Sequence, residues 1–188
     1  MAVKTFAVGE LATSADVNTY LTNAGLVYVT QVSPTAASTI AVSNCFSSTY
    51  DNYKVIVTPV ISASASDIRI KLRSGGTPSS VNYYMTNIFA SAGAISSTSE
   101  AGQVSWRGVY CGTGGSDGKY NSLTFDLFGP FLATATRYDM RSSAWDSTSV
   151  VNRSATGFHD LSTSYDGFEL SAGSNITATI TVYGYRKA

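Results

Sequence analysis

Apolar and polar residues alternate over most of the chain beyond residue 25, and this period of two is typical of β-strands with one buried face. The clearest example is segment 68–73, in which three aliphatic residues alternate with three basic residues. We therefore expect the aliphatic side chains to face a core and the basic ones to face water. Strands are predicted at 26–31, 52–58, 68–73, 82–89, 104–111, 120–128, 137–145, 149–158, 167–170 and 175–185.

Turn-forming residues separate these strands. Glycine, proline, serine and aspartate gather in segments 74–78, 112–118 and 165–167, where they favour tight turns. The strands follow one another without helix-length periodic segments, which argues against βαβ units. The sequence therefore predicts an all-β fold, namely an antiparallel β-sandwich of the jelly-roll-like kind.

A short helix is predicted ahead of the strands, at residues 12–21. Thr13 or Ser14 suits the N-cap position, and Asp16 follows in the first turn, where the helix dipole favours a carboxylate. The apolar residues of one face are Val17, Tyr20 and Leu21. A helix of about two turns is too short to be stable alone, so this face is expected to dock on another surface.

The composition narrows the classes of partner. Charged residues make up 13% of the 188 residues, and 12 basic residues balance 12 acidic ones. Without a basic surplus, binding to nucleic acid or to anionic lipid is not expected. The chain begins without the apolar core of a signal peptide, and no apolar run reaches the roughly 18 residues of a membrane span. We expect a protein that is made in a cytoplasm, is not inserted in a membrane, and has one β domain at 26–188 behind a leader at 1–25.

No set of residues in the sequence predicts catalysis. The one histidine, His159, precedes Asp160, but adjacent strand residues point to opposite faces, so Asp160 is poorly placed to orient the ring. The sequence has no G-x-S-x-G motif. Several of its acidic residues lie beside turns, where aspartate favours local hydrogen bonds. We interpret His159 as a structural residue and expect no enzymatic activity.

Cofactor and metal sites are not predicted either. Cys45 and Cys111 are far apart and form no C-x-x-C pair, so we interpret both as buried free thiols. The sequence has no histidine and cysteine cluster for zinc and no calcium-binding loop. The glycine-rich segment 112–118 lacks the G-K-[ST] sequence of a phosphate-binding loop, and is predicted to form a hairpin tip.

Aromatic residues offer a candidate binding surface. Tyrosine and tryptophan rings pack against sugars and anchor contacts between proteins. The candidates for a receptor or glycan face are Tyr83, Tyr84, Trp106, Tyr110, Tyr120 and Trp145. Because strand residues alternate between two faces, about half of these rings are expected to lie in the core.

Segment 6–21 reads F-A-V-G-E-L-A-T-S-A-D-V-N-T-Y-L. It resembles a leader of many tailed-bacteriophage structural proteins, which reads approximately F-x-x-G-E-x-L-T-A-A-D-V-N-x-Y-L. Leu11 stands one place earlier than in that pattern, and segments 46–57 and 167–185 are also similar to proteins of this group. The residues assigned to a virion-anchoring leader are Phe6, Gly9, Glu10, Leu11, Thr13, Asp16, Val17, Asn18, Tyr20 and Leu21.

The resemblance implies a virion structural protein whose leader binds other virion proteins. Appendages of this kind are commonly homotrimers, and symmetric association would give the leader helix a partner. The first hypothesis is a tail-fibre or adhesin-like protein that contacts a host surface glycan or protein through its aromatic face. The second hypothesis is a capsid decoration, or cement, protein. The third is a polysaccharide-binding or depolymerase module.

Overall fold

The structure is a computed structural model that describes residues 7–11, 13, 25–62, 64, 66–111, 121–145 and 148–187. Within these residues it contains twelve strands and no helix, so the expected all-β class is confirmed. The helix predicted at 12–21 lies outside the described residues, apart from Thr13.

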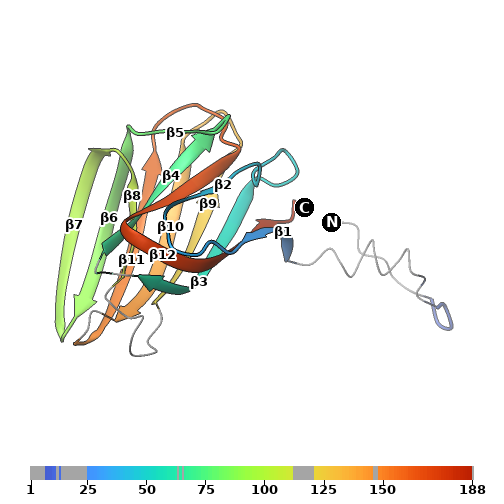
Figure 1. Ribbon diagram of the computed structural model, residues 1–188. Helices are drawn as coiled ribbons and strands as arrows, with labels where there is room; N and C mark the ends of the chain where they lie inside the picture. The colour runs from blue at the N-terminus through green and yellow to red at the C-terminus, as the bar shows by residue number, and fades with distance from the viewer. Residues whose placement is uncertain are drawn as a thin grey trace.

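The strands are β1 (Leu26–Val32), β2 (Ala37–Val42), β3 (Asn52–Ser62), β4 (Ser66–Ser74), β5 (Thr77–Pro78), β6 (Tyr83–Ser91), β7 (Ala94–Gln103), β8 (Trp106–Cys111), β9 (Asn121–Phe128), β10 (Thr136–Trp145), β11 (Val150–His159) and β12 (Gly167–Tyr185). All pairs are antiparallel. They form one continuous sheet in the order β5-β4-β12-β3-β9-β10-β11-β6-β7, with β1 and β2 also on β12 and β8 also on β4. The sheet is antiparallel and curled (Figure 1), and the expected sandwich arrangement stays a prediction.

The long strand β12 produces much of the curl because it belongs to two parts of the sheet. Its residues 167–171 lie between β2 and β4. Its residues 180–184 lie between β1 and β3. The register shifts between these two stretches, at Ser171 and Ile176, and such irregularities bend a strand and increase its twist.

Strand β8 lies across the concave side of the sheet and completes the core. Its Trp106 ring stacks on Tyr138 of β10, with 4.6 Å between the ring centroids. The Tyr138 hydroxyl donates a 2.6 Å hydrogen bond to the Arg107 carbonyl. We call the face of the sheet that carries the core the inner face, and the opposite face of β3, β9, β10, β11, β6 and β7 the outer face.

The core consists of the alternate residues that the sequence pattern predicted to be buried. The aliphatic residues of segment 68–73 are fully buried, as are those on one face of β3 and of the second part of β12. The largest fully buried side chains are Trp106, Tyr53, Tyr83, Tyr138, Tyr165, Phe125 and Phe168. Burying an apolar side chain of this size stabilises a fold by roughly 1.5–3 kcal/mol, so the inner face accounts for most of the hydrophobic stabilisation.

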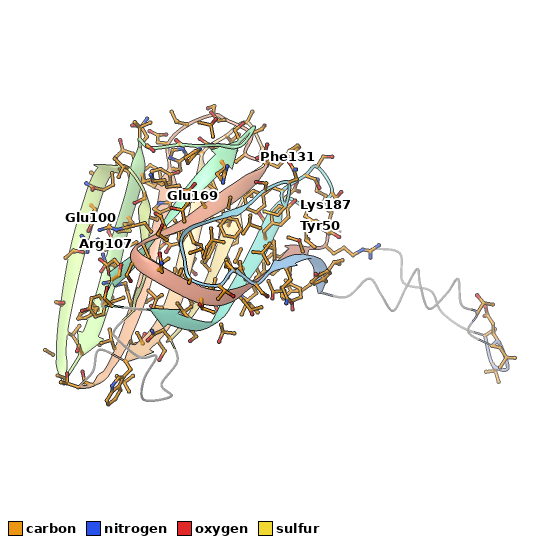
Figure 2. All side chains as sticks on the ribbon, in the orientation of Figure 1. Tyr50, Glu100, Arg107, Phe131, Glu169 and Lys187 are labelled. Carbon is orange, nitrogen blue, oxygen red and sulfur yellow. The ribbon has the colours of Figure 1, made fainter. Side chains whose placement is uncertain are left out.

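An ionic cluster joins four strands at the side of this core. Asp67 of β4 lies 3.1 Å from Arg107 of β8 and 3.2 Å from Arg153 of β11, measured between carboxylate oxygens and guanidinium nitrogens. Glu100 of β7 lies 2.7 Å from the Nε of Arg107, and Figure 2 shows these two side chains next to each other. The Arg153 side chain is 7% exposed. The cluster therefore links the last strand of the sheet, β7, to β8 and β4 at the other end of the curl.

Three strands were not predicted, and one was predicted as two. The short β5 falls in segment 74–78, which was predicted to form a turn. β2 and β7 fall in segments rich in serine, threonine and alanine without a clear apolar period. The predicted strands 167–170 and 175–185 are both parts of β12. The small residues between them suggested a turn, but the backbone continues through them as an irregular strand.

Candidate functional site

A row of large side chains crosses the outer face where β6, β11 and β10 lie side by side. Tyr84 of β6 is in register with Phe158 of β11, and Phe158 is in register with Arg137 of β10. Side chains of directly opposite residues share a face, and the neighbours of these residues along each strand, apart from the half-buried Gly157, are buried. The strand pairing therefore brings two rings and a guanidinium together from three separate parts of the sequence.

These residues line a hollow of about 380 Å³ that opens to solvent. Its floor and walls come from β6, β7, β10 and β11, and we call it the aromatic hollow. Its lining includes two aromatic rings, three hydroxyl side chains and one guanidinium, from Tyr84, Phe158, Thr86, Ser99, Thr156 and Arg137.

The two rings of the aromatic hollow stack on each other. The Tyr84 and Phe158 ring centroids are 4.8 Å apart and the ring planes are inclined by 9°. Phe158 is 38% exposed and Tyr84 is half-buried. Stacking fixes both rings in one orientation, so the ring surfaces that remain exposed form a rigid apolar platform.

Hydroxyl groups surround this platform. The Thr86 and Ser99 hydroxyls lie 3.3 Å apart across the β6–β7 pair, and Thr156 donates a 3.3 Å hydrogen bond to the Tyr138 carbonyl. All three side chains are exposed. Each hydroxyl oxygen can accept a further hydrogen bond, and one hydroxyl of the Thr86–Ser99 pair keeps a proton to donate. The aromatic hollow therefore combines an apolar surface with polar groups of low charge.

The carboxylate of Glu100 also lines the aromatic hollow, but it is directed to Arg107. Its side chain is 13% exposed, and the neighbouring guanidinium compensates its charge. In contrast, Arg137 is exposed and makes no ion pair or hydrogen bond with any residue that the structure describes.

Gly157 holds β11 close to β6 beneath the two rings. A Cβ atom on Gly157 would lie 2.1 Å from the Tyr84 carbonyl oxygen and 2.9 Å from the Cα of Met85. Side chains larger than hydrogen therefore do not fit there without separating the two strands. The glycine sets the spacing that allows Tyr84 and Phe158 to stack.

The structure separates the six aromatic residues that the sequence offered for a receptor or glycan face. Tyr83 and Trp106 are fully buried in the core, so the prediction that they belong to a binding face is wrong and both are structural residues. Their rings meet edge to face with centroids 4.9 Å apart. The alternation of strand residues predicted that about half of these rings would lie in the core. The register of the strands determines which rings are buried.

The remaining candidates are scattered. Tyr110 is half-buried on β8, and Tyr120 lies outside the described residues. Trp145 is half-buried and pairs with Val150 of β11. Val150 is eight residues from Phe158, the partner of Tyr84, and eight residues of a strand span roughly 26 Å. Of the five candidates that the structure describes, Tyr84 alone lines the aromatic hollow.

Four of the residues assigned to the leader are described. Gly9 has a positive φ of 88° in a turn closed by a 3.0 Å hydrogen bond from the Glu10 N–H to the Ala7 carbonyl. The Glu10 carboxylate accepts a second 3.0 Å bond from the Ala7 N–H. Glycine is favoured at such a turn position because it has no Cβ. Leu11 and Thr13 are exposed, and Phe6, Asp16, Val17, Asn18, Tyr20 and Leu21 lie outside the described residues.

Cys45 is a buried free thiol, as expected. Its Sγ lies 3.5 Å from the Val42 carbonyl oxygen, to which the thiol donates. Burial raises the pKa of the Cys45 thiol to about 12, so the reactive thiolate is rare near neutral pH. The side chain of Cys111 lies outside the description, and its expected burial stays a prediction.

His159 is fully buried and both ring nitrogens have partners. Nδ1 lies 3.1 Å from the Asn82 carbonyl oxygen, which can only accept, so Nδ1 carries the proton. Nε2 then accepts a 2.6 Å hydrogen bond from the Tyr165 hydroxyl, with the Ser79 hydroxyl 3.2 Å away. The ring also stacks on Tyr83, with centroids 4.2 Å apart. This environment supports the interpretation of His159 as a structural residue.

We expect acid to destabilise the protein through His159. Burial lowers the pKa of His159 below its usual value of 6.5, so the unfolded chain binds this proton more readily than the folded one. Both states are neutral at His159 above pH 6.5. As the pH falls below that value, the free energy of unfolding should decrease by up to about 1.4 kcal/mol per pH unit, until the folded-state pKa is reached.

Urea unfolding between pH 7.5 and 5 measures this slope. His159→Gln keeps one donor and one acceptor but cannot titrate, so its free energy of unfolding should depend less on pH over the same range. Equal slopes in the two proteins would contradict the assignment of the acid sensitivity to His159.

The sequence did not identify most of the aromatic hollow. Cross-strand register, which no local sequence pattern specifies, brings most of its side chains together. These are Phe158, Arg137, Thr86, Ser99 and Thr156. The one available signal was the alternation in β10 and β11, which directs Arg137 and Phe158 away from the core.

Comparison with protein-family models, with curated proteins and with solved structures finds no match to the chain. In the part of the chain that the structure describes, no helix is long and apolar enough to cross a membrane. Nor do those residues contain a group of three or more histidine, cysteine, aspartate or glutamate side chains placed to hold a metal ion.

Proposed function

We propose that this chain is a non-enzymatic bacteriophage virion structural protein, a tail-fibre or adhesin-like appendage that binds a saccharide of the host surface in the aromatic hollow. The observation that carries the proposal is the exposed, stacked pair of Tyr84 and Phe158 rings, surrounded by hydroxyl groups. The leader-like segment 6–21 supports the virion location.

A saccharide suits the aromatic hollow because its surface has the same two components. One face of a pyranose ring presents C–H groups, which pack on an aromatic ring. The hydroxyls at its edge can donate to the oxygens of Thr86, Ser99 and Thr156, and can accept from the free proton of the Thr86–Ser99 pair. A volume of about 380 Å³ falls within the range of small-molecule sites.

The rest of the proposal concerns assembly. The leader, residues 1–25, attaches the β domain, residues 26–188, to other virion proteins, and three copies associate as a homotrimer. We assign the curled sheet to the jelly-roll-like sandwiches, because Trp106 of β8 packs on Tyr138 of β10 and Phe168 of β12 packs on Phe125 of β9 across the inner face. Binding requires neither a cofactor nor a metal ion.

A capsid decoration protein is the second candidate, and one observation favours it. Ile88, Ile95 and Val150 are 54%, 78% and 62% exposed at the other end of the outer face. Exposed aliphatic residues grouped on one surface mark contacts with proteins. A decoration protein would use this aliphatic patch to contact capsid subunits and would bind nothing outside the particle.

Virions carrying Tyr84→Ala/Phe158→Ala separate the two candidates. We expect the variant chain to be present in purified particles, while adsorption to host cells and binding of the isolated chain to host polysaccharide fall at least ten-fold. Ile88→Ala/Val150→Ala is the matched control, because it also removes exposed apolar surface from the outer face, and it should leave adsorption unchanged.

Several results would refute the proposal. If the wild-type chain were absent from particles, the virion role would be wrong. If the control pair abolished incorporation and the ring pair had no effect on adsorption, the protein would act in decoration. Release of sugars from the polysaccharide by the purified chain would instead support a depolymerase.

A further inference from the structure

The exposed guanidinium of Arg137 gives the aromatic hollow a charge preference. Arg137, Phe158 and Tyr84 stand on adjacent strands in one row. Neighbouring strands lie about 4.8 Å apart, so the row extends roughly 10 Å, which accommodates one or two sugar rings. A ring packed on the platform therefore has its edge within reach of the guanidinium.

The charged residues of the strands next to Arg137 do not compensate its positive charge. Arg137, Asp139 and Arg141 alternate on the outer face of β10, so two guanidinium groups flank one carboxylate. The cross-strand neighbour of Asp139 is Asp126, and the Asp126 carboxylate is occupied by Lys54, whose Nζ lies 3.2 Å away. On β10, β9 and β3 this part of the outer face carries three cations and two carboxylates, an excess of one cation on these strands.

Among the residues that the structure describes, Glu100 has the only carboxylate that lines the aromatic hollow, and Arg107 compensates its charge. Glu100 pairs with Arg107, which in turn lies 3.1 Å from Asp67. An incoming anion therefore meets the free guanidinium of Arg137 and a compensated ion pair. Guanidinium groups bind carboxylates through two parallel N–H···O bonds, which makes them selective for that planar anion.

We propose that the aromatic hollow binds an acidic saccharide, in which a sugar carboxylate pairs with Arg137 while the apolar face of the ring packs on Tyr84 or Phe158. This inference rests on the proposed function and adds the class of sugar. Neutral sugars could use the rings and hydroxyls but would leave the guanidinium without a partner. The preference for uronic or other carboxylate-bearing sugars comes from Arg137 alone.

The test uses the intact chain and polysaccharide purified from the host surface, before and after chemical reduction of its carboxyl groups to alcohols. Reduction keeps the sugar rings and removes the anions. We expect the reduced polymer to bind about ten- to hundred-fold more weakly, because a hydrogen bond to a charged group contributes about 1.5–3 kcal/mol. Titration calorimetry at fixed ionic strength provides the two dissociation constants.

Arg137→Gln should lower the affinity for the native polymer to that of the reduced polymer, and should not change binding of the reduced polymer. Arg141→Gln is the matched control, because it removes the same charge from the same strand and face, outside the aromatic hollow. We expect it to change either affinity less than two-fold. Both variants replace exposed side chains and should unfold at the wild-type temperature.

The outcomes separate this inference from the proposed function. Equal binding of native and reduced polymer, a host polymer without carboxylates that still binds, or equal losses in the two arginine variants would overturn the acidic preference. If binding in those cases still required Tyr84 and Phe158, the proposed saccharide site would stand. If no polysaccharide bound at all, both proposals would fail.

Discussion

Asp67→Asn is expected to lower the free energy of unfolding by about 3 kcal/mol, one of the two largest effects that we predict for a single substitution. Asp67 is the centre of the ionic cluster, with Arg107 and Arg153 at 3.1 and 3.2 Å. Removing its charge leaves the guanidinium of Arg153, 7% exposed, without a counter-ion in the interior. Breaking a buried pair by removing one partner costs about 3–5 kcal/mol, and partial exposure of Asp67 places the effect at the lower end.

Chemical denaturation of wild type and variant measures this difference. Asp139→Asn is the matched control, since Asp139 is an exposed aspartate on a strand, and its replacement should change the free energy of unfolding by less than about 0.5 kcal/mol. In the double variant Asp67→Asn/Arg153→Met the loss should be smaller than the sum of the single losses, because the uncompensated charge is gone. A loss below 1 kcal/mol for Asp67→Asn would mean that the cluster does not join the two ends of the curl.

Gly157→Ala is expected to destabilise the protein by a similar amount, about 3 kcal/mol, and also to weaken saccharide binding. The added methyl group would overlap the Tyr84 carbonyl and approach the backbone of Met85, so β6 and β11 must move apart. Overpacking costs typically 1–3 kcal/mol where the neighbours can shift, and backbone atoms shift less readily than side chains. The same movement would disturb the stacking of Tyr84 and Phe158.

Gly173→Ala provides the control for this substitution. Its Cβ would meet only the Ser66 hydroxyl, at 3.2 Å, a contact that a small shift of this side chain relieves while its 2.7 Å hydrogen bond from the Gly173 N–H is kept. We expect a change of less than about 1 kcal/mol in the free energy of unfolding and none in binding. If Gly157→Ala were as stable as wild type, the close approach of β6 and β11 would not be a requirement of the fold.

The strands that were predicted correctly are those in which packing and pattern agree. In β4, each aliphatic residue of segment 68–73 is buried, because period two matches the geometry of a sheet with one face in the core. β7 was not predicted because its sequence has no alternating pattern. Nearly all of its side chains are exposed, so no alternation is required of its sequence, and it is a strand because β6 offers a partner.

The candidate site was less predictable than the fold. Tyr83 and Tyr84 are adjacent and identical in type, yet one is a core residue and the other lines the aromatic hollow. The register of β6 against β11 decides between them, because a shift of one residue exchanges the two faces. Phe158 and Arg137 were not selected because each is unremarkable within its own strand.

β12 has a consequence for the order of events during synthesis. Whatever follows it in the chain, β12 leaves the ribosome after the eleven other strands, yet it inserts between β2 and β4 and between β1 and β3. Until then, four strands have unpaired edges and the curl cannot close. The core therefore cannot close before β12 has been synthesised, and the many sequence-distant pairings imply slow folding. During that interval the open edges are exposed to self-association.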